Sequence, residues 1–99
     1  MTTVDIIIEA IEKGQSISFG YHGFERTVSP YLCGLTPKNE IKMIGWQTDG
    51  GSNSGVVFKL RYFTVADILG PTLSDAPYTE PTPEHKELYS QFTKIYAQR

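Results

Sequence analysis

The chain has 99 residues, of which 39% are hydrophobic and 20% are charged. This length suits one domain with one modest core, and the hydrophobic content is too high for a disordered chain. No apolar run approaches the roughly 20 residues that a membrane-spanning helix needs. The net charge of −2 argues against a protein held on nucleic acid by bulk positive charge.

The N-terminus and the cysteine content together predict a cytoplasmic protein. Residues 1–5, Met-Thr-Thr-Val-Asp, do not place a basic region before an apolar one, as a signal peptide does. Cys33 is the single cysteine and cannot form an internal disulfide. Because disulfides belong to oxidising compartments, we expect a reducing cytoplasm.

The first predicted element is a helix over residues 4–13. Its apolar residues recur at i, i+3, i+4 and i+7 from Val4 to Ile11, and Gly14 stands where a C-cap glycine belongs. The β-branched run 6–8 also suits a strand, but the polar residues of the segment share the opposite face of a helix. So short a helix is marginal in water. We therefore expect its isoleucines to pack on a sheet.

Strand patterns follow the helix. Alternation predicts strands over 16–21 and 24–29, joined by a turn at His22 and Gly23. Pro30 is expected to end the regular pairing of the second strand or to mark a sheet edge. Residues 31–35 are predicted to be extended, and a turn follows at 36–39.

A second pair of strands is predicted over 41–47 and 56–63. Both segments are rich in β-branched and aromatic residues, and the eight residues between them, 48–55, are almost entirely turn formers. Strands this short, with helices only at the ends, predict a small barrel or a strongly bent sheet. The expected fold class is mainly β with flanking helices (α+β).

The last third has a different composition. Four prolines and several acidic residues predict an irregular connection over 71–82. Thr82 followed by Pro83 has the pattern of a helix start, which predicts a short helix over about 83–90. Residues 92–97 suit either a helix or a closing strand, and we predict a strand.

The order of the central motifs resembles that of the WYL domain. The motifs are ISFGY at 17–21, RTVSP at 26–30, MIGW at 43–46 and FKL at 58–60. WYL domains are small SH3- or Sm-like β-barrels found mainly in bacterial transcription regulators, and the sequence resembles small stand-alone bacterial proteins of that type more closely still. The resemblance covers residues 4–70. Together with the helix, strand and proline patterns, it predicts a single domain over 1–99, with a helix at 4–13, barrel strands at 16–70 and a Pro-containing C-terminal extension at 71–99.

The resemblance also implies ligand binding rather than catalysis, and it has clear departures. Arg26 and Lys59 match basic positions of the family. The Trp-Tyr-Leu tripeptide aligns with residues 41–43, which read Ile-Lys-Met, and a second family arginine falls at Tyr62. Arg61 is one position away, and a shift of one residue in a strand moves the side chain to the opposite face. No helix-turn-helix pattern precedes the barrel strands in this sequence.

Basic and aromatic residues in the strands suggest a binding surface. Residues 14–63 hold five basic and three acidic residues, so the middle of the chain is mildly basic. Cations that bind phosphate and rings that stack on bases are what a nucleotide or single-stranded nucleic acid requires. The ordinary alternative is a set of surface charges and core aromatics in a half-buried sheet. The candidate ligand-binding residues are Tyr21, Arg26, Lys42, Trp46, Gln47, Ser52, Ser54, Lys59 and Arg61.

The loop contributes two of these candidates, Ser52 and Ser54. Its glycines and hydroxyls could cradle an anion through backbone N–H groups. It is not a phosphate-binding loop of the GxxxxGK[ST] kind, because no lysine follows Gly55 and no helix is expected there. A surface hairpin loop is the ordinary alternative.

Signals for catalysis are weak. His22 lies in a turn, His85 lies in the acidic tail, and neither has a partner at triad or metal-ligand spacing. Cys33 is expected to be a small buried hydrophobe. We therefore expect no enzyme activity, no cofactor and no metal.

Two functions remain for comparison. The first is a ligand-binding or sensor module for a nucleotide or single-stranded nucleic acid. The second is a protein-interaction module that forms homo-oligomers through exposed strand edges and has no small ligand.

Overall fold

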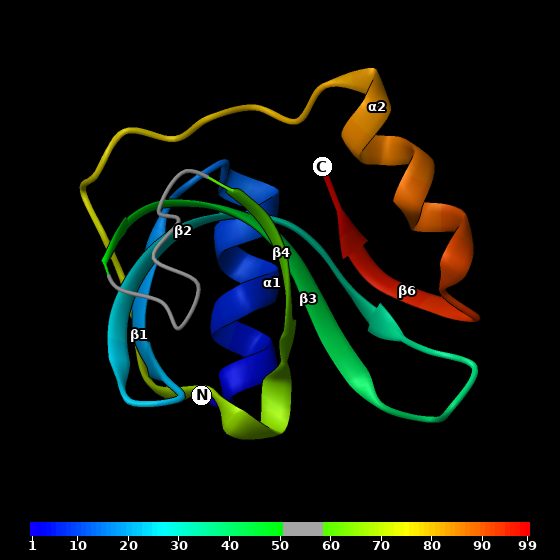
Figure 1. Cartoon of the computed structure of the whole chain (residues 1–99), viewed down its shortest axis with the longest axis horizontal. Coiled ribbons are helices and arrows are strands. Elements are labelled where there is room, and N and C mark those ends of the chain that lie inside the picture. The colour runs from blue at the N-terminus through cyan, green and yellow to red at the C-terminus, as the bar shows by residue number, and fades with distance from the viewer. Residues whose placement is uncertain (51–58) are drawn as a thin grey trace.

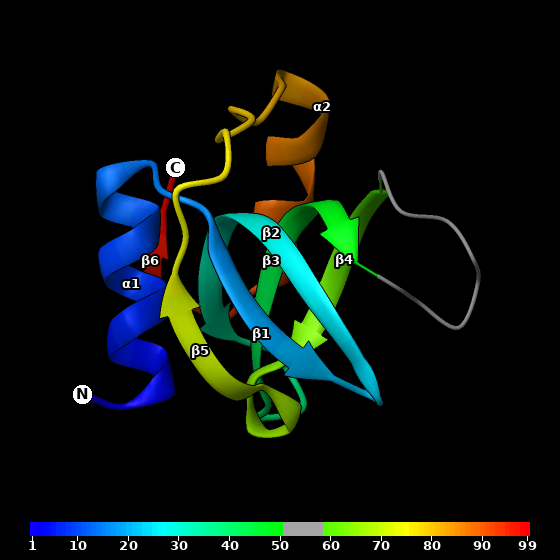
Figure 2. The ribbon, with the colours of Figure 1, turned by 90° about the vertical axis from the view of Figure 1, so that its left-hand side faces the viewer.

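The computed structural model describes residues 1–50 and 59–99. In these residues a strongly bent antiparallel sheet is flanked by helical segments (Figures 1 and 2). No helix in the described part of the chain has the length and apolar character to cross a membrane. The elements are α1 (Thr3–Lys13), β1 (Ile17–Tyr21), β2 (Phe24–Leu35), β3 (Ile41–Gly50), β4 (Lys59–Thr64), the 3-10 turn η1 (Val65–Asp67), β5 (Leu69–Leu73), α2 (Pro83–Lys86), the 3-10 turn η2 (Glu87–Gln91) and β6 (Lys94–Gln98).

Local capping signals define α1, which confirms the predicted helix. The Thr2 hydroxyl accepts a hydrogen bond from the Asp5 N–H at 3.1 Å, and the Asp5 carboxylate accepts one from the Thr2 N–H at 3.1 Å. Gly14 ends the helix in the left-handed conformation, with φ of 65°. As expected, the buried stripe of Ile7 and Ile11 packs on the sheet.

β2 is the centre of the sheet. The strand order is β4-β3-β2-β1-β5, and β6 also pairs with β2. Residues 26–35 of β2 pair with β3. The first part of β2 pairs with β1, and residues 32–35 pair with β6. Because a strand has only two edges, β1 and β6 share the edge of β2 that faces away from β3.

The prediction of a small SH3- or Sm-like β-barrel is wrong, whereas that of a mainly β fold with flanking helices is confirmed. The sheet ends at β4 and β5, which are not paired with each other in the described residues. α1 contacts β2, β5 and β6. β5 therefore lies against the helix instead of against β4, and the bent sheet stays open (Figure 2).

Pro30 does not end its strand. β2 continues through it to Leu35, and Pro30 lies opposite Gly45 in β3. The register of the β2–β3 pair shifts between Pro30 and Leu32. This irregularity accommodates a residue that has no N–H to donate, so proline is tolerated in an internal strand.

The C-terminal third matches most of the predictions. α2 and η2 form the predicted helical segment, and β6 shows that residues 94–98 are a strand. The predicted irregular connection is too long at its start, because β5 includes residues 71–73, and Thr72 and Leu73 pair with β1. The chain then runs without regular structure to Thr82, which caps α2 as predicted.

The two faces of the sheet carry separate apolar clusters. We call them the α1 face and the α2 face, after the helix on each side. The α1 face holds buried residues from α1, β1, β2, β3 and β4, among them Ile7, Phe19, Val28, Met43 and Phe63. The α2 face is built around Tyr31, Leu32, Ile44 and Tyr89, with Trp46 and Leu60 packed against them.

Candidate functional site

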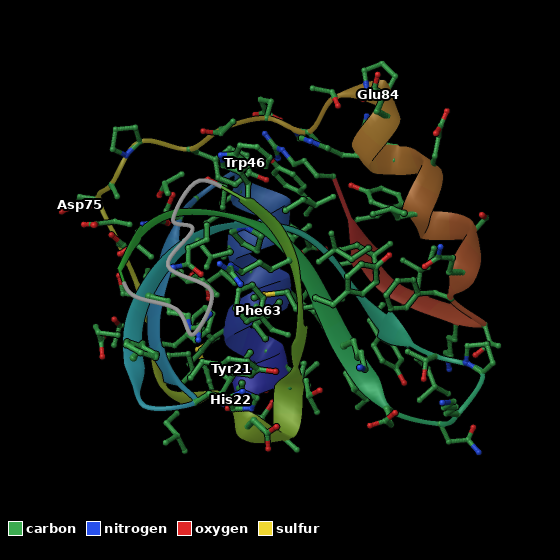
Figure 3. The ribbon with its side chains drawn as sticks, in the orientation of Figure 1. Tyr21, His22, Trp46, Phe63, Asp75 and Glu84 are labelled. Carbon is green, nitrogen blue, oxygen red and sulfur yellow. The ribbon has the colours of Figure 1, made fainter. Side chains whose placement is uncertain are left out.

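The structure divides the predicted ligand-binding residues between the two faces. Tyr21, Arg26, Gln47 and Arg61 lie on the α1 face, and we call these four residues the arginine site. Lys42 and Trp46 lie on the α2 face. Figure 3 shows Tyr21 and Phe63 well separated from Trp46, which lies toward α2. Lys59 pairs with Gln47 in the ladder between β3 and β4, and Ser52 and Ser54 fall outside the described residues.

Alternation along the strands explains this division. Arg61 and Phe63 are two residues apart on β4 and share a face, and Phe63 belongs to the cluster under α1. Arg26 lies opposite Phe19, another member of that cluster. Trp46 lies opposite Leu60, and both pack on the α2 face. The side chains predicted to form one surface are therefore separated by the thickness of the sheet.

Arg26 is the central residue of the arginine site. Only 4% of the residue is exposed. Its Nε donates to the Tyr21 carbonyl at 3.2 Å, and its Nη1 donates to the Gln47 Oε1 at 3.3 Å. The guanidinium carbon lies 5.1 Å from the ring centroid of Tyr21 and 5.9 Å from that of Phe63. Hydrogen bonds and rings thus hold the guanidinium in a fixed position.

The charge of Arg26 has no carboxylate to balance it in the described part of the chain. None of the ion pairs among residues 1–50 and 59–99 includes Arg26. Burial lowers the pKa of Arg26, and the nearby charge of Arg61 lowers it further. A buried cation beside a second cation is costly for a fold. An anion bound there would relieve that cost.

Gln47 and Tyr21 position this charge. Gln47 is fully buried, and its amide oxygen accepts from Arg26. Tyr21 contributes its carbonyl to Arg26, and its hydroxyl accepts from the Thr64 N–H at 2.9 Å. The contact with Thr64 joins the end of β1 to the end of β4, which fixes the ring beside the guanidinium.

His22 extends the ring stack at this end of the sheet. Its imidazole stacks on Tyr21 with centroids 4.0 Å apart and an interplanar angle of 18°. Its Nε2 lies 3.2 Å from Asp67 Oδ2. Figure 3 shows Tyr21 and His22 next to each other. Tyr21 thus contacts both Arg26, which is buried, and His22, which is exposed.

Trp46 and Lys42 have other environments. The indole ring is half-buried, with its centroid 5.3 Å from that of His85, which is packing between the sheet and α2. Lys42 lines a groove of about 420 Å³ together with Tyr62 and Phe92.

Sequence reasoning missed Phe24. Its ring centroid lies 5.8 Å from the guanidinium carbon of Arg26. The available signal was the spacing: Phe24 and Arg26 are two residues apart on one strand and therefore share a face. The sequence alone indicates only that Phe24 begins a strand, because the exposure of its ring depends on the tertiary fold.

The described residues offer little for metal or thiol chemistry. Among residues 1–50 and 59–99, no group of three or more His, Cys, Asp or Glu side chains could hold a metal ion. Cys33 is buried, and burial raises the pKa of its thiol to about 11. Its thiol is therefore protonated at neutral pH, which makes it a poor nucleophile.

Comparison with known proteins gives a fold but no family. No protein-family model matches the chain, and no curated protein matches it in sequence. Proteasome accessory factor B/C (PafBC) of Arthrobacter aurescens is similar in structure, with a TM-score of 0.63 and 17% sequence identity over 84% of this chain. The similarity covers 13% of the PafBC chain, so the present chain corresponds to a small part of that protein.

Proposed function

We propose that the chain is a non-catalytic, cytoplasmic ligand-binding or sensor module, and that the arginine site binds the anionic group of a nucleotide or a single-stranded nucleic acid. The observation that carries the proposal is the buried guanidinium of Arg26, which has no carboxylate partner in the described residues. Two further observations support it. Arg61 adds a second positive charge close by, and rings surround the cations.

The fold also supports a binding function. The sequence resembles the WYL domain, and the present chain shares its fold with part of PafBC. WYL domains are thought to sense ligands such as nucleotides or nucleic-acid fragments. Arg26 stands at a basic position of that family. Its hydrogen bonds to Gln47 and Tyr21 hold the guanidinium in place, and a bound anion would offset the cost of burying its charge.

A titration with nucleotides and short single-stranded oligonucleotides tests the proposal. Trp46 lies on the opposite face of the sheet, so its fluorescence would report poorly on the site, and calorimetry or amide chemical shifts are the better readout. Arg26→Gln should weaken binding by about 10- to 150-fold, which corresponds to the free energy that a hydrogen bond to a charged group contributes. Binding should also weaken as salt rises.

Lys42→Gln is the matched control, because it removes the same charge from the α2 face. It should leave the affinity within about twofold of the unmodified chain, because the half-buried Lys42 lies on the opposite face of the sheet from the arginine site. Arg61→Gln serves as a second site variant if Arg26→Gln does not fold. Equal affinity in the Lys42 and arginine variants would refute the arginine site.

One observation favours the alternative, a protein-interaction module. In the edge strand β5, Leu69 is 68% exposed and Leu73 is 39% exposed. Exposed apolar residues on a sheet edge favour pairing with another chain. Pro71 lies between them and cannot donate to such a pair. Light scattering at high protein concentration distinguishes the two functions: a dimer that Leu69→Lys abolishes would support self-association through β5.

A further inference from the structure

We infer that Phe24 is the ring platform of the arginine site and that the bound group is one nucleotide unit, with its base stacked on Phe24 and its phosphate on Arg26. The inference rests on the proposed function, which it deepens by naming the chemical unit that is recognised. A phosphate alone would use only the arginine, whereas a nucleotide would use the arginine and the ring.

The exposure of Phe24 is the first observation. The rings of Phe19, Phe63 and Tyr21, which lie on the same face, are 0%, 1% and 8% exposed, whereas Phe24 is 36% exposed. Phe24 pairs with Tyr21 beside the tight turn of the β1–β2 hairpin. Threonine or another polar residue would suit such a strand end equally well. Of these four rings, that of Phe24 therefore offers a ligand the most accessible surface.

The open hydrogen-bonding capacity of Arg26 is the second observation. Nε and Nη1 are used by Tyr21 and Gln47. For Nη2 the described residues provide no hydrogen-bond acceptor, although a guanidinium has five N–H donors. Oxyanions are the strongest acceptors for such donors, at about 2.7–2.9 Å. Arg26 therefore has capacity left for an anion.

The distance between these two groups is the third observation. The guanidinium carbon of Arg26 lies 5.8 Å from the Phe24 centroid, close to the limit of about 6 Å for a cation over a ring. The guanidinium therefore lies within cation–π range of the ring, while 36% of Phe24 remains exposed to a ligand. The base and the phosphate of a nucleotide are joined through one sugar, so a single nucleotide can reach both groups. Stacking on an aromatic ring accepts any base, because every base has a flat π-face.

A comparison of three ligands tests the inference. The ligands are a nucleoside monophosphate, ribose 5-phosphate, which has the same sugar and phosphate but no base, and a short single-stranded oligonucleotide. The unmodified chain should bind the monophosphate about 5- to 150-fold more tightly than ribose 5-phosphate, the range measured for one base stacked on a protein aromatic ring. Amide shifts should concentrate at the β1–β2 turn, next to Phe24.

Phe24→Leu keeps an apolar side chain but removes the ring. This variant should bind the nucleoside monophosphate as weakly as ribose 5-phosphate, and its affinity for ribose 5-phosphate should not change. Tyr62→Leu is the matched control, since Tyr62 is an aromatic residue of similar exposure, 40%, on the opposite face. It should keep the full preference for the base. Thermal melting of both variants checks that they are folded.

The outcomes separate the inference from the proposed function. If the unmodified chain binds both small ligands equally, or if Phe24→Leu keeps the preference for the base, the ring platform is refuted and the anion site stands. If none of the three ligands binds, the proposed function itself is refuted. If the oligonucleotide binds at least tenfold more tightly than the monophosphate, the nucleotide unit belongs to a single-stranded nucleic acid. Equal affinities identify the free nucleotide, and either source supports the inference.

Discussion

Gly34 lies where β6 comes so close to β2 that no side chain fits between them. A Cβ atom at this position would lie 2.5 Å from the Lys94 carbonyl oxygen, 3.0 Å from Phe92 Cδ2 and 3.3 Å from Ile95 Cα. All three distances fall below the 3.4–4 Å of ordinary contact. Two of the three atoms belong to the backbone of β6 and cannot turn away by a change of rotamer. Gly34→Ala must therefore move β6 off β2.

The expected cost of Gly34→Ala is about 3 kcal/mol of the free energy of unfolding, the upper end of the range for overpacking. The upper end applies because a backbone shift also disturbs the pairing of residues 32–35 with β6. For a domain of this size, about 3 kcal/mol corresponds to a fall in Tm of roughly 12–24 °C. Urea unfolding followed by far-UV circular dichroism measures the change in the free energy of unfolding directly.

Gly20→Ala is the matched control in β1. A Cβ atom there meets its nearest neighbour, Leu69 Cβ, at 3.7 Å, which is ordinary contact. Alanine also loses less conformational entropy on folding than glycine, so this variant should gain about 0.5–1 kcal/mol. The reasoning is refuted if Gly34→Ala unfolds at the same urea concentration as the unmodified chain. It is equally refuted if both variants lose the same stability.

Two further predictions concern buried polar atoms. The Tyr31 hydroxyl is buried, has no hydrogen-bond partner in the described ranges, and has its pKa raised by burial to about 12. Tyr31→Phe should therefore keep or raise the free energy of unfolding, whereas Tyr78→Phe should lower it by about 1 kcal/mol, because the Tyr78 hydroxyl donates to the Pro30 carbonyl at 2.6 Å. Urea unfolding of both variants should give these opposite signs, and equal losses would contradict the assignment. Burial raises the pKa of the Cys33 thiol to about 11. Its unfolded pKa is about 8.5, so its contribution is fully present below that pH and is lost as the pH rises toward 11. Cys33→Ala should lack this fall in stability, and parallel pH profiles for the two chains would show that Cys33 does not titrate as described.

Elements with local signals could be predicted from the sequence. The capping pair of Thr2 and Asp5 and the terminal Gly14 define α1 without help from the rest of the chain. The turn at His22 and Gly23 has φ values of 49° and 86°, as a tight hairpin requires. These features depend on neighbours within four residues, which a sequence displays directly.

Features that depend on docking could not be predicted in this way. Residues 69–73 contain Gly70 and Pro71, which argue against a strand, yet they pair with β1 because η1 returns the chain to that edge. The openness of the sheet follows from the position of α1 beside β5. Neither the pairing of β5 with β1 nor the contact of α1 with β5 is indicated by the residue types in these segments.

The candidate site was predictable in part. Alternation along residues 41–47 indicates that Lys42 and Trp46 share one side of their strand, but it does not show which side faces α1. The register of the β2–β3 pair also shifts between Thr27, which pairs with Asp49, and Val28, which pairs with Gln47. The residue types at these positions do not indicate such a shift. The meeting of Arg26 with Gln47 therefore emerged only from the three-dimensional structure.

The position of β2 in both apolar clusters has a consequence for cooperativity. Val28 and Cys33 of this strand belong to the cluster on the α1 face, and Tyr31 and Leu32 belong to the cluster on the α2 face. Loss of the packing on either face would expose one side of β2, and the cluster on the other face also depends on β2. The two clusters are therefore expected to unfold cooperatively. The chain should melt in one step, and neither cluster should remain folded without the other.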